Sequence, residues 1–132
     1  MSDLQLHVDL AAEPIVVYDC WMHSVHHGTF TEAFASIDPR TDGKYKLWGG
    51  VVTGHFISLD RPRKIIQSWR TSEFPSYQAS STVTLDLKPR KGETRLLITH
   101  EQIPQQLLEQ FRYGWEEFYF PRMQFYFSAN QL

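Results

Sequence analysis

The feature that most restricts how this chain can fold is an aromatic segment close to its C-terminus. Residues 114–127 contain seven of the 19 Phe, Tyr and Trp residues of the chain and no Lys. Apolar residues in and before this segment recur at spacings of four, four and three, at Leu107, Phe111, Trp115 and Phe118. This is the period of one helix face, and it carries more large rings than a surface helix needs to bury one stripe. We therefore predict a long helix from Pro104 onward that covers a large apolar surface.

Seven extended segments precede this helix. Each combines period-two alternation, or a run of β-branched and aromatic residues, with turn-forming residues at its ends. They comprise residues 4–10, 33–38, 45–48, 51–59, 65–71, 82–87 and 94–100. Between the first two, the spacing of Val17, Trp21 and Val25 predicts one helix of about three turns that begins at Pro14 and ends near Gly28.

The order of these elements predicts an α+β fold in which a curved antiparallel sheet wraps around a long C-terminal helix. A length of 132 residues suits one domain, so we expect residues 1–132 to form a single unit. A curved sheet packed on one helix leaves room for a cavity between the two. Such an apolar cavity is a natural binding place for a small hydrophobic molecule.

Composition narrows the range of partners and compartments. A formal net charge of -2 provides no excess of Lys and Arg for a phosphate backbone, so we expect no nucleic-acid partner. Cys20 is the only cysteine of the sequence, which excludes an internal disulfide and favours a reducing compartment. No segment has the roughly 20 apolar residues of a membrane span, and the N-terminus lacks an export signal. We expect a cytoplasmic protein that is either a monomer or a homodimer.

Short stretches in a fixed order along the chain carry a resemblance to a known family. They include Asp19-Cys20-Trp21, Trp48-Gly49-Gly50, Gln67-Ser68-Trp69-Arg70, Thr99-His100, Gly114-Trp115 and Tyr119-Phe120. On these stretches the chain resembles the family of activators of the 90-kDa heat-shock protein ATPase, within the START-like (SRPBCC) superfamily. The resemblance implies a small stand-alone member with a helix-grip (Bet v 1-like) fold, in which the sheet holds the C-terminal helix over a deep cavity. It also implies a role connected with the stress response.

Seven residues are candidates for lining this cavity and binding the ligand. Large rings from strands and helices supply apolar contact area, and His100 shares the inward face of its strand with Leu96 and Ile98. The candidates are Trp21, Trp48, Trp69, His100, Phe111, Trp115 and Tyr119. The alternative for each ring is ordinary core packing, with His100 hydrogen-bonded to the backbone or to water. Alternation along its strand points Arg70 away from Trp69, toward solvent or a partner.

Two groups of reactive residues have alternative interpretations. His23, His26 and His27 cluster at the predicted end of the first helix, where they can either bind zinc or face the solvent. We favour the solvent because no Cys pair or HExxH pattern accompanies them. Cys20 follows Asp19, whose carboxylate raises the pKa of a neighbouring thiol, so a structural role is favoured over a nucleophilic one. We predict no catalytic residue, no metal site and no cofactor.

Three functions are compatible with these patterns. The first is non-enzymatic binding of a lipid or an aromatic compound between the sheet and the C-terminal helix. The second, implied by the resemblance, is a partner protein that stimulates the ATPase of a 90-kDa heat-shock chaperone. The third is a polyketide cyclase-like enzyme, which START-like cavities support and for which His100 is the candidate titratable residue. We favour the first on the resemblance in fold together with the aromatic content.

Overall fold

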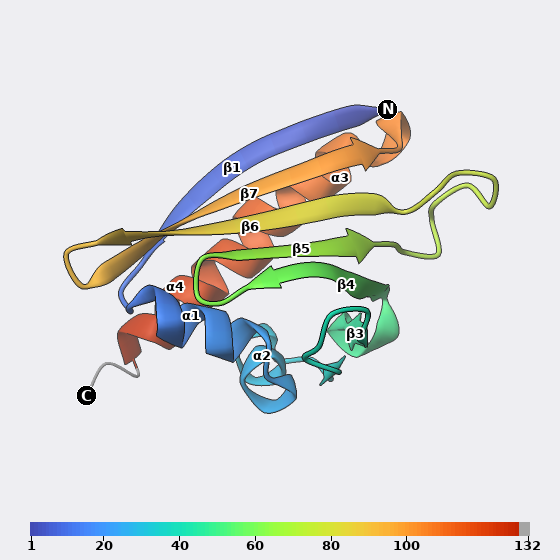
Figure 1. Ribbon diagram of the computed structural model, residues 1–132. Helices are drawn as coiled ribbons and strands as arrows, with labels where there is room; N and C mark the ends of the chain where they lie inside the picture. The colour runs from blue at the N-terminus through green and yellow to red at the C-terminus, as the bar shows by residue number, and fades with distance from the viewer. Residues whose placement is uncertain (130–132) are drawn as a thin grey trace.

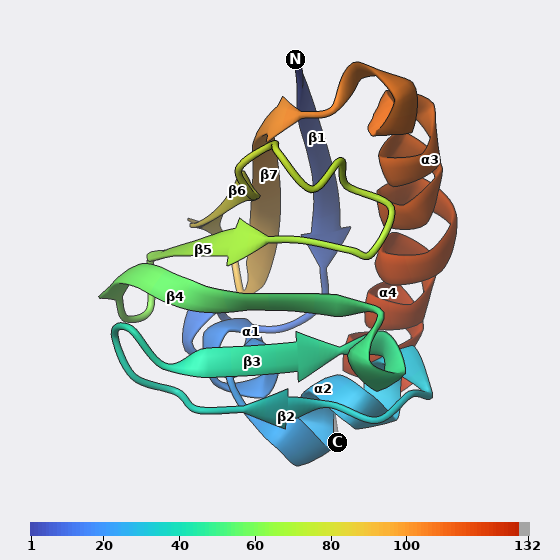
Figure 2. The ribbon, with the colours of Figure 1, turned by 90° about the vertical axis from the view of Figure 1, so that its right-hand side faces the viewer.

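The computed structural model describes residues 1–129 and consists of one curved sheet around a long C-terminal helix (Figure 1). Its seven antiparallel strands have the order β1-β7-β6-β5-β4-β3-β2. The strands are β1 (Ser2–Leu10), β2 (Ser36–Ile37), β3 (Lys44–Leu47), β4 (Val52–Asp60), β5 (Lys64–Trp69), β6 (Ser81–Arg90) and β7 (Glu93–Ile103). Figure 2 shows the sheet curving around the helix, with two short N-terminal helices closing its lower end. The predicted arrangement of sheet and helix is confirmed.

The hairpin of β6 and β7 has the apolar inward face that its alternation predicts. Its register opposes Leu85 to Ile98 and Leu87 to Leu96. All four side chains are buried, and so is His100, two positions further along the same face. Because side chains alternate between the two faces of a strand, this register places every second residue against the C-terminal helix.

The C-terminal helix is built from four consecutive segments. They are η2 (Gln105–Leu107), α3 (Leu108–Tyr113), the π-helical turn η3 (Gly114–Tyr119) and α4 (Phe120–Ala129). Buried residues recur at every fourth position, at Leu107, Phe111, Trp115, Tyr119, Met123 and Phe127. The prediction of Phe118 in this stripe is wrong, because Phe118 is 44% exposed and Tyr119 is buried instead. A spacing of four overshoots an α-helical turn by about 40° per step, and the wider π turn reduces this drift.

The single helix predicted before the second strand is wrong, because the chain forms two short helices there. α1 (Pro14–Trp21) begins where predicted, but α2 (Ser24–Thr31) starts after a break and runs beyond Gly28. The backbone of His23 is extended at the break, and its ring Nδ1 accepts a hydrogen bond from the Val25 N–H at 3.2 Å. This contact caps the start of α2. Within residues 1–129, no helix is long and apolar enough to cross a membrane.

β2 is shorter than predicted, and β3 begins and ends one residue earlier than predicted, at a left-handed turn. The extended segment predicted at residues 33–38 pairs only at Ser36–Ile37. Trp48 leaves β3 and starts the 3-10 turn η1 (Trp48–Gly50), where φ is 56° at the tryptophan and 69° and 97° at the two glycines. Glycine adopts such values freely, whereas a bulky side chain rarely does. The turn carries Trp48 to the C-terminal helix, where its ring centroid lies 5.1 Å from that of Tyr119.

Side chains fill most of the space between the sheet and the helix. Trp21, which is 1% exposed, and Phe30 project from the N-terminal helices into the main apolar cluster. Their ring centroids lie 6.4 Å apart, and the ring of Trp21 lies 6.3 Å from that of Trp115. Rings therefore fill the space around Trp21, and open space beside the C-terminal helix takes the form of a pocket of about 240 Å³.

Candidate functional site

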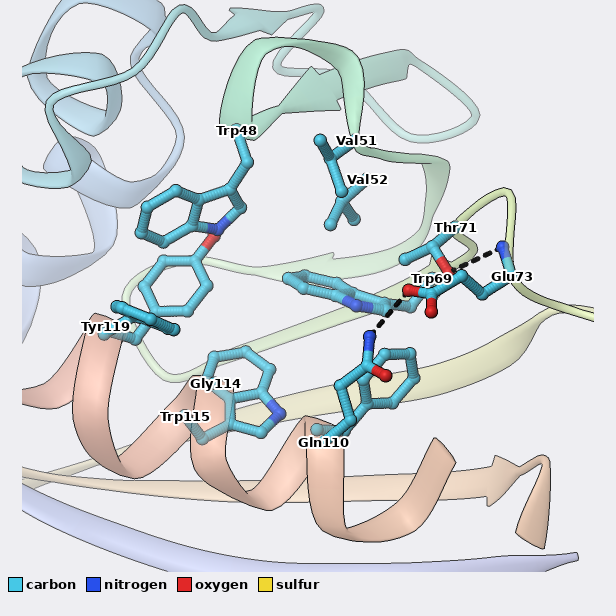
Figure 3. A pocket seen from close by; sticks show the side chains of 12 residues that line it. Trp48, Val51, Val52, Trp69, Thr71, Glu73, Gln110, Gly114, Trp115 and Tyr119 are labelled. Atoms are coloured by element: carbon cyan, nitrogen blue, oxygen red, sulfur yellow. Dashed lines mark hydrogen bonds between the residues drawn. The ribbon is translucent and has the colours of Figure 1, made fainter. Parts of the chain in front are cut away.

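A pocket of about 240 Å³ opens between the C-terminal helix and the strands that face its middle turns. Figure 3 shows the helix on one side, with η1 and the ends of β4 and β5 on the other. Six aromatic rings, two valines and four small or polar residues line it. They are Trp48, Val51, Val52, Trp69, Thr71, Glu73, Gln110, Phe111, Gly114, Trp115, Phe118 and Tyr119. The pocket therefore has mainly apolar walls, with its polar groups contributed by few side chains.

Ring contacts fix the walls of this pocket. The ring centroids of Trp69 and Trp115 lie 5.2 Å apart, and those of Trp115 and Tyr119 lie 4.8 Å apart with an interplanar angle of 24°. Trp48 meets Tyr119 nearly edge-on, at 81°. Pairs of this kind contribute roughly 0.5–1.5 kcal/mol each beyond the burial of their area. The walls are therefore stabilised by contacts among themselves, independently of a ligand.

A buried hydrogen-bond chain behind the pocket holds Tyr119. The Nδ1–H of His27 donates to the carbonyl oxygen of Trp21 at 2.8 Å, so His27 Nε2 accepts from the Tyr119 hydroxyl at 3.0 Å. Burial lowers the pKa of His27 to about 4, against the opposing effect of its bond to Trp21. Burial also raises the pKa of Tyr119 well above its usual value, with an opposing hydrogen bond from Trp48. Both side chains are neutral near pH 7, and the hydroxyl is used within the protein.

His100 forms a second buried chain and has no nitrogen left for a ligand. The Trp115 indole N–H donates to His100 Nδ1 at 3.1 Å, so Nε2 carries the proton and donates to Ser81 Oγ at 2.7 Å. The Ser81 hydroxyl in turn donates to the Trp69 carbonyl oxygen at 3.0 Å. Burial lowers the pKa of His100 to about 3. We therefore do not propose a cyclase-like reaction with His100 as its base.

Trp21 also lies behind the pocket. Its indole N–H donates to Gln67 Oε1 at 2.9 Å, and its ring packs against His27 with centroids 4.4 Å apart. Five of the seven predicted cavity residues line the pocket, namely Trp48, Trp69, Phe111, Trp115 and Tyr119, and Trp21 and His100 do not. The two that do not line it orient the rings that do.

One end of the pocket is polar and is formed by the loop after β5. The Gln110 amide donates to Glu73 Oε1 at 2.6 Å, and the Glu73 backbone N–H donates to Thr71 Oγ1 at 3.3 Å (Figure 3). Arg70 stabilises this loop, because its guanidinium donates to the carbonyl oxygens of Gln78 at 2.7 Å and Pro75 at 3.1 Å. The prediction that Arg70 points to solvent or to a partner is therefore wrong.

Gly114 leaves the helix side of the pocket open. Its backbone is helical, with φ −59° and ψ −45°. Among the described residues, apart from its two chain neighbours and the local helix backbone, no atom lies within 4 Å of where a Cβ would stand on Gly114. Gly114, Gln110, Phe118 and Glu73 also line the pocket and were not among the predicted cavity residues. The first three are spaced by four along one helix face, so periodicity could have found them, whereas the loop residue Glu73 has no such signal.

The three histidines near the break between α1 and α2 do not converge on one point. His23 caps α2, His27 is buried, and His26 Nδ1 lies 2.6 Å from the Tyr126 hydroxyl. Over residues 1–129, no group of three or more His, Cys, Asp or Glu side chains is arranged to hold a metal ion. Burial first, and then the charge of Asp19, raise the pKa of the Cys20 thiol, which disfavours the thiolate that a nucleophile requires.

Most of the chain matches a known protein family. The family model described as Activator of Hsp90 ATPase homolog 1-like protein matches residues 11–128. The Homo sapiens Activator of 90 kDa heat shock protein ATPase homolog 1 is 33% identical over 91 residues, which cover 69% of this chain and 27% of that protein. The chain thus spans about a quarter of the length of this curated relative.

Solved structures show the same fold. A Plasmodium falciparum HSP90 activator superposes with a TM-score of 0.82 at 22% identity, covering 89% of each chain. CalU16 from Micromonospora echinospora superposes with a TM-score of 0.80 at 19% identity, covering 98% of this chain and 78% of that one. These likenesses confirm the predicted helix-grip fold. Because the family model matches residues 11–128, this chain belongs to the Activator of Hsp90 ATPase homolog 1-like family, as its resemblance predicted.

Proposed function

We propose that this protein binds a small apolar molecule in the pocket between its C-terminal helix and η1. The observation that carries the proposal is the open space above Gly114. Glycine inside a helix is about 1 kcal/mol less favourable than alanine, and here it keeps a gap between aromatic walls. Val51 and Phe118 at this gap are 61% and 44% exposed. A ligand that covers apolar side chains removes their surface from water, which favours binding.

The volume of about 240 Å³ limits the size of this molecule. An apolar cavity of about 150 Å³ admits benzene, and pockets for drug-sized ligands measure roughly 300–1,000 Å³. A compound of one or two rings therefore suits this pocket better than a long lipid chain. Of the two ligand classes predicted from the sequence, we propose the aromatic one.

The test is calorimetric titration with benzene, indole and naphthalene, using a variant that fills the pocket. Gly114→Leu extends a side chain into the open space and should weaken binding of any member of this panel at least tenfold. Glu116→Leu adds the same side chain at an exposed residue of the same helix that does not line the pocket, so it should leave binding unchanged. Absence of binding to the unmodified protein, or equal binding to both variants, would reject the proposal.

The family membership supports a second candidate, stimulation of a chaperone ATPase. The human relative and the Plasmodium falciparum protein are both described as activators, of the 90 kDa heat shock protein ATPase and of HSP90. We propose this activity only as an alternative, because the chain covers 27% of the human protein. The measurement is the ATPase rate of the host's 90-kDa chaperone with and without saturating protein, and an unchanged rate would reject it.

We propose the cytoplasm as the site of either activity, since a lone half-buried cysteine suits a reducing compartment. A homodimer is the alternative to a monomer because Phe125 is 73% exposed on α4. Light scattering after size-exclusion chromatography distinguishes the two. A mass that stays at 15.5 kDa across a hundredfold concentration range would exclude the dimer.

A further inference from the structure

The pocket has two chemically different ends, and this difference indicates the class of its ligand. We infer that the ligand is a protonated amine carried on a small apolar body, an inference that rests on the binding function proposed above. Among the lining side chains of the described residues, Glu73 is the only charged one. The remaining lining is six rings, two valines, Thr71, Gln110 and Gly114. A donor or a cation is therefore complementary to the pocket, and an anion is not.

Glu73 has hydrogen-bonding capacity to spare. A carboxylate accepts about four hydrogen bonds, and Gln110 donates one of them, to Oε1. Figure 3 shows the carboxylate extending back from its loop toward Thr71 and Trp69, beside the amide of Gln110. An ammonium group at this end can donate to the carboxylate while its apolar body occupies the rest of the pocket.

The aromatic lining near this end also favours a positive charge. Ring faces carry negative partial charge, so they attract a cation within about 6 Å of their centroids. Phe111 is the lining ring on α3, which also bears Gln110, and Trp69 is the lining ring at the end of β5, which leads into the loop of Glu73. The same faces repel a carboxylate.

The two arginines beside the pocket are engaged within the protein. The Arg122 guanidinium lies 5.9 Å from the ring centroid of Trp48 and 5.5 Å from that of Phe118. It is not one of the lining residues, and its partner is Glu32, at 4.0 Å. Arg70 donates to loop carbonyl groups. Since neither arginine lines the pocket, its one lining carboxylate orients the ligand, with the amine toward Glu73 and the apolar body toward Trp48.

The experiment compares three compounds that share one body and differ in charge. They are 4-phenylbutylamine, 4-phenylbutan-1-ol and 4-phenylbutyrate, titrated calorimetrically at pH 7 and low ionic strength. We expect the amine to bind about three- to fivefold more tightly than the alcohol, as for a partly exposed ion pair, and the acid to bind most weakly. Glu73→Gln should abolish the preference for the amine over the alcohol. Glu116→Gln removes the same charge outside the pocket and should preserve that preference.

The outcomes separate this inference from the function on which it rests. If the alcohol binds, Gly114→Leu prevents its binding, and the amine has no advantage, the inference is wrong and the binding function stands. If the amine has an advantage that Glu73→Gln leaves intact, the assignment of Glu73 is wrong. If none of the three compounds binds and the neutral ring panel does not bind either, the proposed function itself fails.

Discussion

Replacing Gly114 by alanine should stabilise the protein, which is unusual for a substitution at a pocket wall. The backbone there is helical, with φ −59° and ψ −45°, so alanine adopts it without strain. Within residues 1–129, apart from the two chain neighbours and the local helix backbone, an added Cβ meets no atom within 4 Å. The gain is then the helix propensity difference, about 0.8–1 kcal/mol. For a chain of this length, such a gain raises the Tm by roughly 3–5 °C.

Urea denaturation followed by tryptophan fluorescence and circular dichroism measures this gain. The matched control is Gly28→Ala, another glycine in a helix, α2. There the new Cβ would lie 2.9 Å from the carbonyl oxygen of Ala33, which is backbone and cannot move freely. We expect Gly28→Ala to be destabilising by about 1–3 kcal/mol. A loss of stability in Gly114→Ala would show that the space above Gly114 is closed, and the argument for the pocket would fail.

Three further predictions concern the groups that support the pocket. Burial lowers the pKa values of His27 and His100 to about 4 and about 3, so between pH 6.5 and those values the unfolded chain binds more protons than the folded one. The free energy of unfolding should therefore fall as the pH drops below 6.5, by up to about 2 kcal/mol per histidine at pH 5. A urea midpoint that stays constant from pH 7 to pH 5 would contradict this. Tyr119→Phe removes the hydroxyl bonded to His27 and should lower the free energy of unfolding by about 1–3 kcal/mol, whereas Tyr113→Phe, at a side chain that is 59% exposed, should have little effect. Arg70→Ala removes two bonds to loop carbonyls and should accelerate limited proteolysis within residues 71–80; cleavage at the unmodified rate would show that this arginine does not hold the loop.

The sheet was predictable because its signal is local. Alternation in residues 82–87 and 94–100 identifies an inward face, and the observed pairing of Leu85 with Ile98 uses that face. The helix stripe was predictable only as far as Trp115. Beyond it, the π turn shifts the phase and buries Tyr119 in place of Phe118. A period of 3.6 residues contains no information about where a helix widens, since tertiary packing against the sheet determines that position.

Most aromatic residues of the candidate site were predictable from the sequence, but its polar residues and the boundary of its open space were not. A large aromatic residue is expected to be buried, so Trp69 and Trp115 were reasonable candidates. Whether a buried ring borders open space depends on packing, and packing places Trp21 in the core. Glu73 lies in a loop whose path is set by bonds from Arg70 to carbonyl groups 5 and 8 residues away. Neither propensity nor periodicity reports such bonds, because they depend on the folded geometry of the loop.

Filling the pocket also distinguishes the two candidate functions. Gly114→Leu fills the space inside the pocket. Val51 lies at the opening, beside η1, where it is 61% exposed and accessible to a partner protein. If the protein acts by holding a small molecule, Gly114→Leu should lose indole binding, and Val51→Asp should weaken it too, because it places a carboxylate in the apolar wall of the pocket. If it acts by touching a chaperone at this rim, Val51→Asp should reduce ATPase stimulation, because burying an unpaired carboxylate in an interface is unfavourable. Gly114→Leu would then stimulate normally. Loss of both activities in Gly114→Leu, with its fold intact by circular dichroism, would mean that the ligand and the chaperone depend on the same pocket.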